Sequence, residues 1–143
     1  MAILHVDNEN AMAWAGLCNE LWPHHSIDEM LTDFYKGEYP NEYLYYAGDM
    51  PVAFMSLSVR NEYVEGREDD KPVGYLEGIY VKPECRRQGI AKALVQYAKH
   101  WSAERGCAIL ASDCELSNAD SRAFHNKMGF NEVSINIHFA ISL

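Results

Sequence analysis

Residues that are scarce in this 143-residue chain already exclude several classes of protein. Lysine and arginine number only 12 against 21 aspartates and glutamates, which gives a formal net charge of −9. Nucleic-acid phosphates attract surfaces rich in Lys and Arg, so this balance argues against a nucleic-acid partner. It suits a cationic small molecule, although an acidic composition also serves simple solubility.

Long apolar runs, a basic leader and paired cysteines are missing as well. No stretch approaches the roughly 20 apolar residues of a membrane span, and the first residues do not have the pattern of a signal peptide. The four cysteines form no C-x-x-C pair, so they are typical of reduced thiols. Cys107, Cys114 and His100 lack the paired spacing of a metal site. We therefore expect a cytoplasmic protein without a membrane anchor or a metal.

The residues that are present fit one packed domain. Hydrophobic residues make up 48% of the chain and aromatic residues 12%, which argues against disorder. The length suits one compact domain, and neither an internal repeat nor a Pro/Ser-rich linker divides it. We expect a single domain over residues 1–143.

Apolar residues recur at helical or strand spacing along the whole chain. Ser26, with Glu29 three residues later, has the pattern of a capping box. Asn118 is placed to cap the last helix. The expected helices cover 8–21, 27–35, 89–104 and 119–128, and the expected strands cover 43–47, 52–60, 73–81, 107–112 and 133–141. This order predicts an α/β protein in which a mixed sheet has helices on both faces.

The segment Arg86–Ala91 (RRQGIA) follows a strand and opens a helix. Unpaired N–H groups and the helix dipole make such a place an anion site. Gly89 lets the backbone approach a bulky phosphate, and the small Ala91 keeps the first helical turn open. An ordinary basic helix start is the other interpretation of this segment.

The strand Leu76–Pro83, the Arg86–Ala91 loop and the stretch Phe124–Phe130 together resemble the GNAT N-acetyltransferase superfamily. The resemblance spans nearly the whole chain and implies a splayed central mixed sheet. It implies that the loop holds the pyrophosphate of acetyl-CoA, and that backbone N–H groups of the strand hold its thioester carbonyl and pantetheine as an oxyanion site does. The cofactor-binding residues it implies are Ile79, Tyr80, Val81, Arg86, Arg87, Gln88, Gly89, Ile90, Ala91 and Asn118.

Shorter segments resemble, more specifically, the compact aminoglycoside 6′-N-acetyltransferases. They are Leu21–Pro23, Glu62–Gly66, Leu76–Val81 and Ala111–Asp113. This resemblance implies that the acceptor amine belongs to an aminoglycoside antibiotic and that the enzyme confers resistance. The contacts it implies with that substrate are Trp22, Tyr63, Glu77 and Asp113.

Elementary electrostatics agrees with that assignment. Glu77 lies in one expected strand and Asp113 ends the next, so two carboxylates face the cleft that splayed parallel strands leave. One carboxylate–ammonium pair at 4 Å gains about 4 kcal/mol of gross Coulomb energy at an effective dielectric constant near 20. Each residue also has a structural interpretation: Trp22 as a core aromatic, Glu77 as a surface strand residue and Asp113 as a turn or cap.

The acceptor amine must lose a proton before it attacks the thioester, and nearby carboxylates oppose that loss. One carboxylate should therefore accept the proton, and Glu77 is the expected base because of its place beside the thioester site. Many GNAT enzymes carry a tyrosine general acid in the last helix, where this chain has His125. His125 could protonate the CoA thiolate or could simply pack in the helix. Tyr80 is a further candidate acid.

Other functions stay open at this point. A polyamine or protein N-acetyltransferase would share the fold, and a non-catalytic acyl-CoA-binding module would share the phosphate loop. The regular alternation of residues 133–141 predicts a half-buried antiparallel strand. Because such an edge strand can pair with a second subunit, we expect a homodimer.

Overall fold

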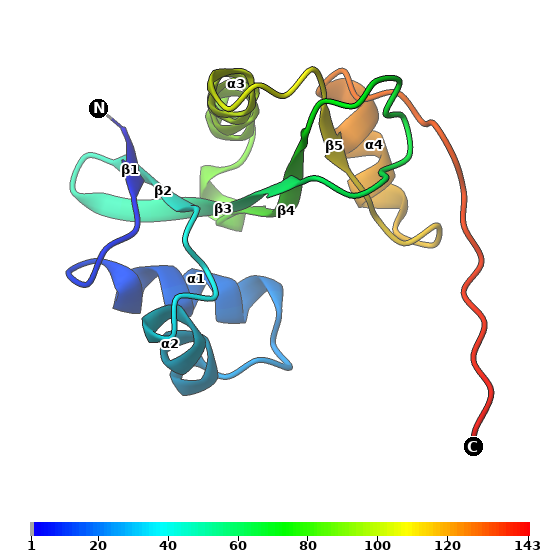
Figure 1. Ribbon diagram of the computed structural model, residues 1–143. Helices are drawn as coiled ribbons and strands as arrows, with labels where there is room; N and C mark the ends of the chain where they lie inside the picture. Colours follow the sequence, from blue (N-terminus) through cyan, green and yellow to red (C-terminus); the bar gives the residue numbers. More distant parts are fainter. Residues whose placement is uncertain (1) are drawn as a thin grey trace.

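The computed structural model describes residues 2–143 and shows a five-stranded sheet with four α-helices around it (Figure 1). In chain order the elements are β1 (Ile3–His5), α1 (Ala11–Leu21), α2 (Ile27–Tyr35), β2 (Glu42–Ala47), β3 (Met50–Arg60), β4 (Val73–Val81), a 3-10 turn (Pro83–Cys85), α3 (Ile90–Glu104), β5 (Leu110–Ser112) and α4 (Ala119–Lys127).

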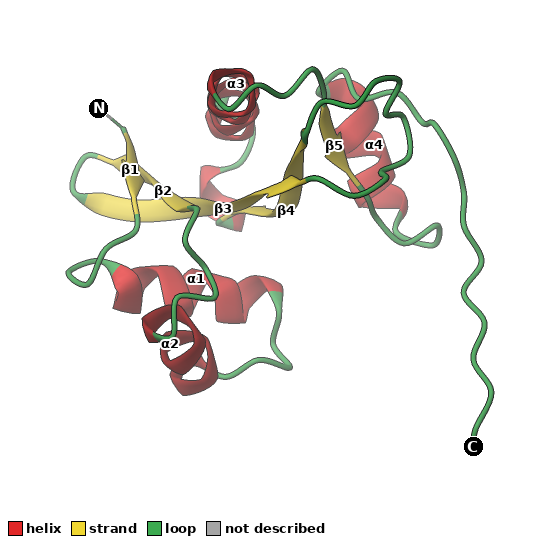
Figure 2. Ribbon diagram, in the orientation of Figure 1, coloured by secondary structure: helices red, strands yellow, loops and turns green. Residues whose placement is uncertain are grey.

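The sheet has the order β1-β2-β3-β4-β5 and is mixed. The first four strands pair antiparallel, whereas β5 runs parallel to β4. Helices α1 and α2 lie on one side of the sheet and α3 on the other, with α4 beside β5 (Figure 2). The predicted α/β architecture with helices on both faces is therefore confirmed.

Local sequence signals explain where the helices begin. The Ser26 hydroxyl accepts a hydrogen bond from the Glu29 amide at 3.1 Å, which confirms the predicted cap of α2. The Asn118 side chain accepts one from the Ser121 amide at 3.1 Å at the start of α4. Helix α1 begins a few residues later than predicted, which is the usual uncertainty of helix ends.

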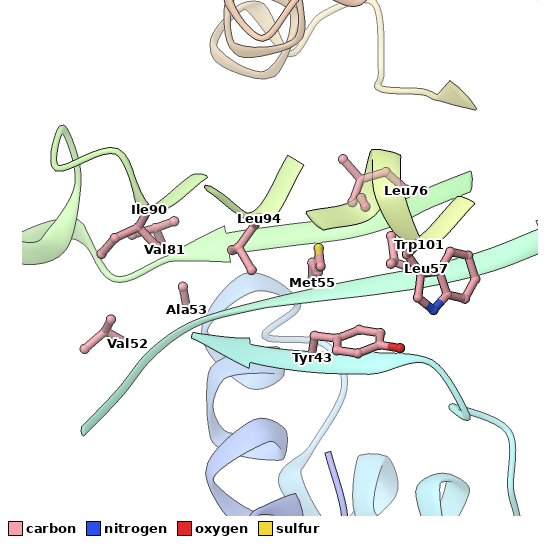
Figure 3. Packing of buried hydrophobic residues seen from close by; sticks show 11 residues of the cluster. Tyr43, Val52, Ala53, Met55, Leu57, Leu76, Val81, Ile90, Leu94 and Trp101 are labelled. Atoms are coloured by element: carbon pink, nitrogen blue, oxygen red, sulfur yellow. The ribbon is translucent and has the colours of Figure 1, made fainter. Parts of the chain in front are cut away.

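Successive side chains of β3 point to opposite faces of the sheet and pack in two separate hydrophobic cores. Phe54 faces α1 and α2, where it joins Trp14 and Leu44. Its neighbour Met55 faces α3, where it packs in the cluster that contains Leu94 (Figure 3). Each such side chain stabilises the fold by roughly 1.5–3 kcal/mol when fully buried. The central strands are thus held from both sides, which fixes the position of β4.

The prediction of a half-buried strand over 133–141 is wrong for the single chain. Residues 131–143 form an extended arm that leaves the domain (Figure 1). The large apolar side chains within residues 133–141 are exposed, from 61% for Val133 to 91% for Phe139. The alternation identified the extended backbone correctly, but a strand also needs a neighbour, and the arm pairs with no strand of its own chain within residues 2–143. Strand β5 is shorter than predicted and only partly buried.

Candidate active site

The parallel pairing of β4 with β5 ends early. It covers Gly74 to Leu76 on β4, opposite Leu110 to Ser112, and β4 then continues to Val81 without β5 beside it. The backbone of the last five residues of β4, 77–81, therefore borders an opening between the two strands. Ile79, Tyr80 and Val81, which the resemblance assigned to thioester binding, lie on this segment.

Glu77 is the extra residue of a β-bulge. The register between β3 and β4 pairs Ser56 with Gly78 and Leu57 with Leu76, so Glu77 has no direct partner. A bulge bends its strand and redirects a side chain, and bulges are frequent beside active sites. Here the bulge lies where β4 separates from β5, which turns a regular strand residue into a residue of the opening.

Arg60 holds the carboxylate of Glu77. The Nη2 atom of Arg60 donates to both carboxylate oxygens at 2.9 Å, and Nε donates to Oε2 at 3.2 Å. The Ser58 hydroxyl donates to Oε2 at 2.5 Å. Sequence reasoning missed Arg60, because its approach to Glu77 depends on the bulged register between β3 and β4.

Asp113 lies just beyond the C-terminal end of β5 and is joined to the same network. The Tyr75 hydroxyl donates to Asp113 Oδ2 at 2.8 Å, and the Arg60 guanidinium lies 3.5 Å from the centre of the Tyr75 ring. Burial and the hydrogen bond to Asp113 raise the pKa of the Tyr75 phenol, so this phenol remains a donor. The chain from Glu77 through Arg60 and Tyr75 to Asp113 thus links the two predicted carboxylates.

The two predicted aromatic contacts differ in environment. Trp22 follows α1, packs edge-to-face on Phe54 with ring centres 5.6 Å apart, and lies against Gly78, next to Glu77 in β4. It is therefore both a core residue and a neighbour of the site. Tyr63 is 70% exposed, and its hydroxyl donates to Glu65 at 3.2 Å within the loop of residues 61–72.

His125 reaches from α4 to the end of β5. Its Nε2 lies 2.8 Å from the Ser112 hydroxyl and its Nδ1 lies 2.7 Å from the Ser121 carbonyl oxygen. The same Ser112 hydroxyl donates to the Leu76 carbonyl oxygen at 3.1 Å. His125 is thereby tied to the last paired residue of β4. Tyr80, the other candidate acid, instead donates its hydroxyl to Glu20 of α1 at 3.0 Å.

The Arg86–Ala91 loop has the backbone of an anion site. Arg87 has φ 62° and Gly89 has φ 80°, and α3 starts immediately afterwards. The amide of Ala93 makes the first helical bond, to Gly89, so the amides before it in the first turn are not used within the helix. Successive N–H groups in such a turn form a concave nest for phosphate oxygens. Arg86 donates from Nε to the Val81 carbonyl at 2.9 Å, which joins the loop to β4.

Some of these groups line a broad cleft of about 1370 Å³ beside β5 and α4. Its lining includes Arg60, Tyr63, Asp113 and His125, together with the first half of the C-terminal arm. The volume exceeds the roughly 300–1,000 Å³ of a drug-sized ligand site, so it has room for a large polar molecule or for more than one ligand.

Comparison with known proteins agrees with this fold. The model of the Acetyltransferase (GNAT) family matches residues 5–130. The chain belongs to the GNAT acetyltransferase family. A curated relative of this family member, aminoglycoside N(6′)-acetyltransferase type 1 of Acinetobacter genomosp. 13, is 37% identical over 142 residues, which are 97% of either chain. The protein of that name from Salmonella enteritidis is 33% identical over 92% of either chain.

Solved structures of GNAT enzymes superpose closely on the chain. Aminoglycoside 6′-N-acetyltransferase AAC(6′)-IG from Acinetobacter haemolyticus gives a TM-score of 0.90 at 34% identity and covers 100% of this chain and 99% of its own. Aminoglycoside N-acetyltransferase AAC(6′)-Iy in complex with CoA gives 0.89 at 31% identity, covering 99% and 94%.

For this GNAT family member, the part of the chain that the structure describes holds no cluster of three or more His, Cys, Asp or Glu side chains that could bind a metal. The four cysteines are free thiols. None of the helices in residues 2–143 has both the length and the apolar character to cross a membrane.

Proposed function

We propose that this acetyltransferase moves the acetyl group of acetyl-CoA to the 6′ amine of an aminoglycoside by direct transfer, and so confers resistance. The observation that carries the proposal is the chain of contacts that joins Glu77 to Asp113 through Arg60 and Tyr75, where β4 and β5 cease to pair. Glu77 lies just before the backbone of Ile79–Val81, where a thioester would be held. The names of the relatives, which act on aminoglycosides, support the same substrate class.

The cofactor half of the site consists mainly of backbone. The turn with positive φ at Arg87 and Gly89 fits a pyrophosphate, because a Cβ is absent at Gly89 and no atom lies within 4 Å of where one would stand. The amides of Gln88, Ile90 and Ala91 belong to the same turn. Asn118 uses its side-chain oxygen to cap α4, and its amide nitrogen would serve the pantetheine arm. Acetyl-CoA supplies the acetyl group as an activated thioester.

The acceptor half carries the negative charge. Glu77 and Asp113 would bind substrate ammonium groups, while Trp22 and Tyr63 offer flat faces to sugar rings. Glutamates of the 61–72 loop extend this acidic surface. A neutral or anionic acceptor gains nothing from such a cleft, whereas a polycationic sugar does.

Glu77 acts as the base in this proposal. It accepts the proton that the substrate ammonium loses, and the free amine nitrogen then bonds to the acetyl carbon as the carbon–sulfur bond breaks. The nitrogen loses its second proton to solvent as the amide forms, and the thiolate takes up one proton, so the reaction releases one proton in all. Each unit by which a carboxylate raises the amine pKa adds about 1.4 kcal/mol to the free energy of deprotonating the amine. A carboxylate that bound the ammonium without also removing its proton would therefore slow the reaction. Water can relay the proton from the amine to Glu77.

His125 is placed to return a proton to the thiolate. Because a carbonyl oxygen only accepts, Nδ1 beside the Ser121 carbonyl carries hydrogen, and Nε2 is the nitrogen left to pass a proton to the thiolate. When neutral, Nε2 accepts from the Ser112 hydroxyl; when protonated it donates, and that hydroxyl turns to the Leu76 carbonyl. His125 can therefore hold or release a proton without losing its hydrogen bonds.

A second copy of the chain completes the proposed enzyme. The exposed arm carries apolar side chains at every second residue, and β5 presents a free outer edge in the sheet order. A strand of this kind pairs readily with another subunit, so we propose a homodimer in which the arm is the contact. Acetyl-CoA is a metabolite of the cell interior, which makes the cytoplasm the proposed location.

Release of the CoA thiol by the purified protein tests the function. Kanamycin, tobramycin, spermidine and a lysine peptide are each offered with acetyl-CoA. Turnover on the aminoglycosides is expected, with a loss of about 100-fold or more in Glu77→Gln if Glu77 is the base. Asp113→Asn keeps an acceptor for Tyr75 and should mainly raise KM. Turnover only on spermidine or the peptide would transfer the assignment to those amines, and silence with tight CoA binding would indicate a non-catalytic module.

A further inference from the structure

The carboxylate proposed to receive a substrate ammonium already carries a cation of the protein itself. Arg60 contacts both oxygens of Glu77 through Nη2 and one of them through Nε, at 2.9–3.2 Å. Both side chains are about one-third exposed, at 33% each. Arg60 lines the cleft and both side chains of the pair are partly exposed, so an incoming ligand can reach the pair.

Arg60 also has a second support that does not depend on Glu77. Its guanidinium carbon lies over the Tyr75 ring, 3.5 Å from the ring centre, and Tyr75 donates a hydrogen bond to Asp113. A guanidinium can stack on an aromatic face and form a planar ion pair at once, which an ammonium cannot do in the same way. Arg60 can therefore lose Glu77 and still retain a favourable contact.

We propose that Arg60 is an internal competitor of the substrate, which holds Glu77 in the empty site and is displaced by the ammonium group of the acceptor. The inference rests on the proposed function, in which Glu77 receives that ammonium. It explains how the negative charge of Glu77 stays balanced between turnovers. It also means that Glu77 becomes free to accept a proton only when an amine has replaced Arg60.

The exposure of the Arg60–Glu77 ion pair sets how strongly Arg60 competes with the substrate. Exposed ion pairs hold only weakly, so displacement by a substrate that makes further contacts at Asp113 is feasible. Removal of the competitor should strengthen substrate binding rather than weaken it. A residue that merely orients Glu77, or holds the strand ends together, would give the opposite result when it is removed.

Steady-state kinetics of Arg60→Gln provides the first test. We expect KM for kanamycin to fall by up to about fivefold, the equivalent of the roughly 1 kcal/mol upper value of an exposed pair, with the effect on KM rather than kcat. Arg60→Lys keeps the charge and should return KM toward the wild-type value. Arg105→Gln is the matched control, because Arg105 also stacks on an aromatic ring, at 4.0 Å from Trp101, and does not line the cleft. A rise in KM or a loss of kcat in Arg60→Gln would overturn the proposal.

Binding without turnover separates this inference from the proposed activity. The arginine Nε–H signal of Arg60, assigned by its absence in Arg60→Lys, should shift when kanamycin is added to the ¹⁵N-labelled protein without acetyl-CoA. The signal should not shift with an uncharged sugar at the same concentration. If wild-type protein acetylates spermidine and not kanamycin, the proposed substrate fails while the same titration with spermidine still tests Arg60. An unmoved signal at saturating amine, with turnover intact, would refute the displacement.

Discussion

The indole of Trp22 lies on the backbone of Gly78, so closely that a Cβ at residue 78 would stand 2.7 Å from Cζ2 and 2.8 Å from Cη2 of the ring. No side chain fits in that space. A glycine is thus required at residue 78 because the Trp22 ring comes so close to the backbone, and not because of the backbone angles of Gly78. Since Gly78 directly follows Glu77, this contact sets the distance between the aromatic face and the carboxylate.

Gly78→Ala should therefore displace Trp22 and impair the acceptor site. Overpacking of this kind costs about 1–3 kcal/mol of unfolding free energy. We expect kcat/KM for an aminoglycoside to fall about tenfold or more, since small misplacements at a reacting site have large effects. Kinetics and thermal unfolding of the purified variant measure the two effects.

Gly16→Ala is the matched control, because no atom lies within 4 Å of a Cβ at that helical position. It should leave the kinetics alone and stabilise α1 by about 0.5–1 kcal/mol. In a Trp22→Ala background the Gly78→Ala change should have little further effect. Equal losses in both backgrounds would show that the contact with Trp22 is not the cause.

Because Glu42 is buried, we expect the stability of the protein to depend on pH in an unusual way. It is 1% exposed and accepts a hydrogen bond from Trp14 Nε1 at 2.9 Å. Burial raises its pKa from 4.5 to about 7, and hydrogen bonds from Ser56 and Trp14 only partly oppose the rise. The native state therefore keeps a proton that the unfolded chain releases between about pH 4.5 and 7. The free energy of unfolding should fall as pH rises through that window, by roughly 3 kcal/mol in all.

Glu42→Gln keeps the acceptor for Trp14 and removes the titration. Its Tm should exceed that of the wild type at pH 8, and the difference should shrink toward pH 5. Calorimetry across this range gives the comparison. Glu132→Gln is the surface control, because Arg122 and Asn126 lower the pKa of that exposed carboxyl. A Glu42→Gln variant that is less stable than wild type at every pH would contradict the burial of a titrating group.

Substitution of His125 can separate its two interpretations, general acid and packed helix residue. His125→Phe keeps an aromatic ring against Phe130, whose ring centre lies 5.2 Å away, but cannot carry a proton. If His125 is the general acid, kcat should fall about 100-fold or more with little change in Tm. Ser112→Ala should lower kcat less than His125→Phe does, because it removes the hydroxyl that faces Nε2 but keeps the imidazole. Full activity in His125→Phe would leave only the packing interpretation.

Much of the frame of the site could be predicted because it depends on local signals. Ser26 and Asn118 cap their helices through their own side chains, and Gly89 marks the start of α3. The order of the strands placed Glu77 and Asp113 on neighbouring parallel strands, and the structure links them through Arg60 and Tyr75. Each of these features needs only nearby residues or chain order.

The features that were missed depend on the register between strands, on packing between distant elements, or on a second subunit. The contact of Arg60 with Glu77 arises from the bulge that removes Glu77 from the regular pairing of β3 and β4. The burial of Glu42 could not be read from its strand either, because only the packing of α1 brings Trp14 to it. The alternation of residues 133–141 predicted a strand, but the sequence of one chain does not say which strand lies beside it.

The C-terminal arm makes the proposed dimer testable through its alternation. Ile137 and Phe139 belong to its apolar series, and Asn136 and His138 lie between them on the other face of an extended chain. If a second subunit covers the apolar series, the double change Ile137→Asp, Phe139→Asp should convert a dimer into a monomer of 16.3 kDa. The same charges at Asn136 and His138 should leave the dimer intact.

Light scattering coupled to gel filtration measures these masses directly, over a range of protein concentrations. In a free arm both pairs of substitutions face water, and neither would change the mass. A wild-type protein that elutes as a monomer at every concentration would remove the dimer from the proposal. A dimer that survives the apolar substitutions would place the subunit contact elsewhere on the molecule, because two aspartates buried against a partner strand carry a desolvation penalty of several kcal/mol each.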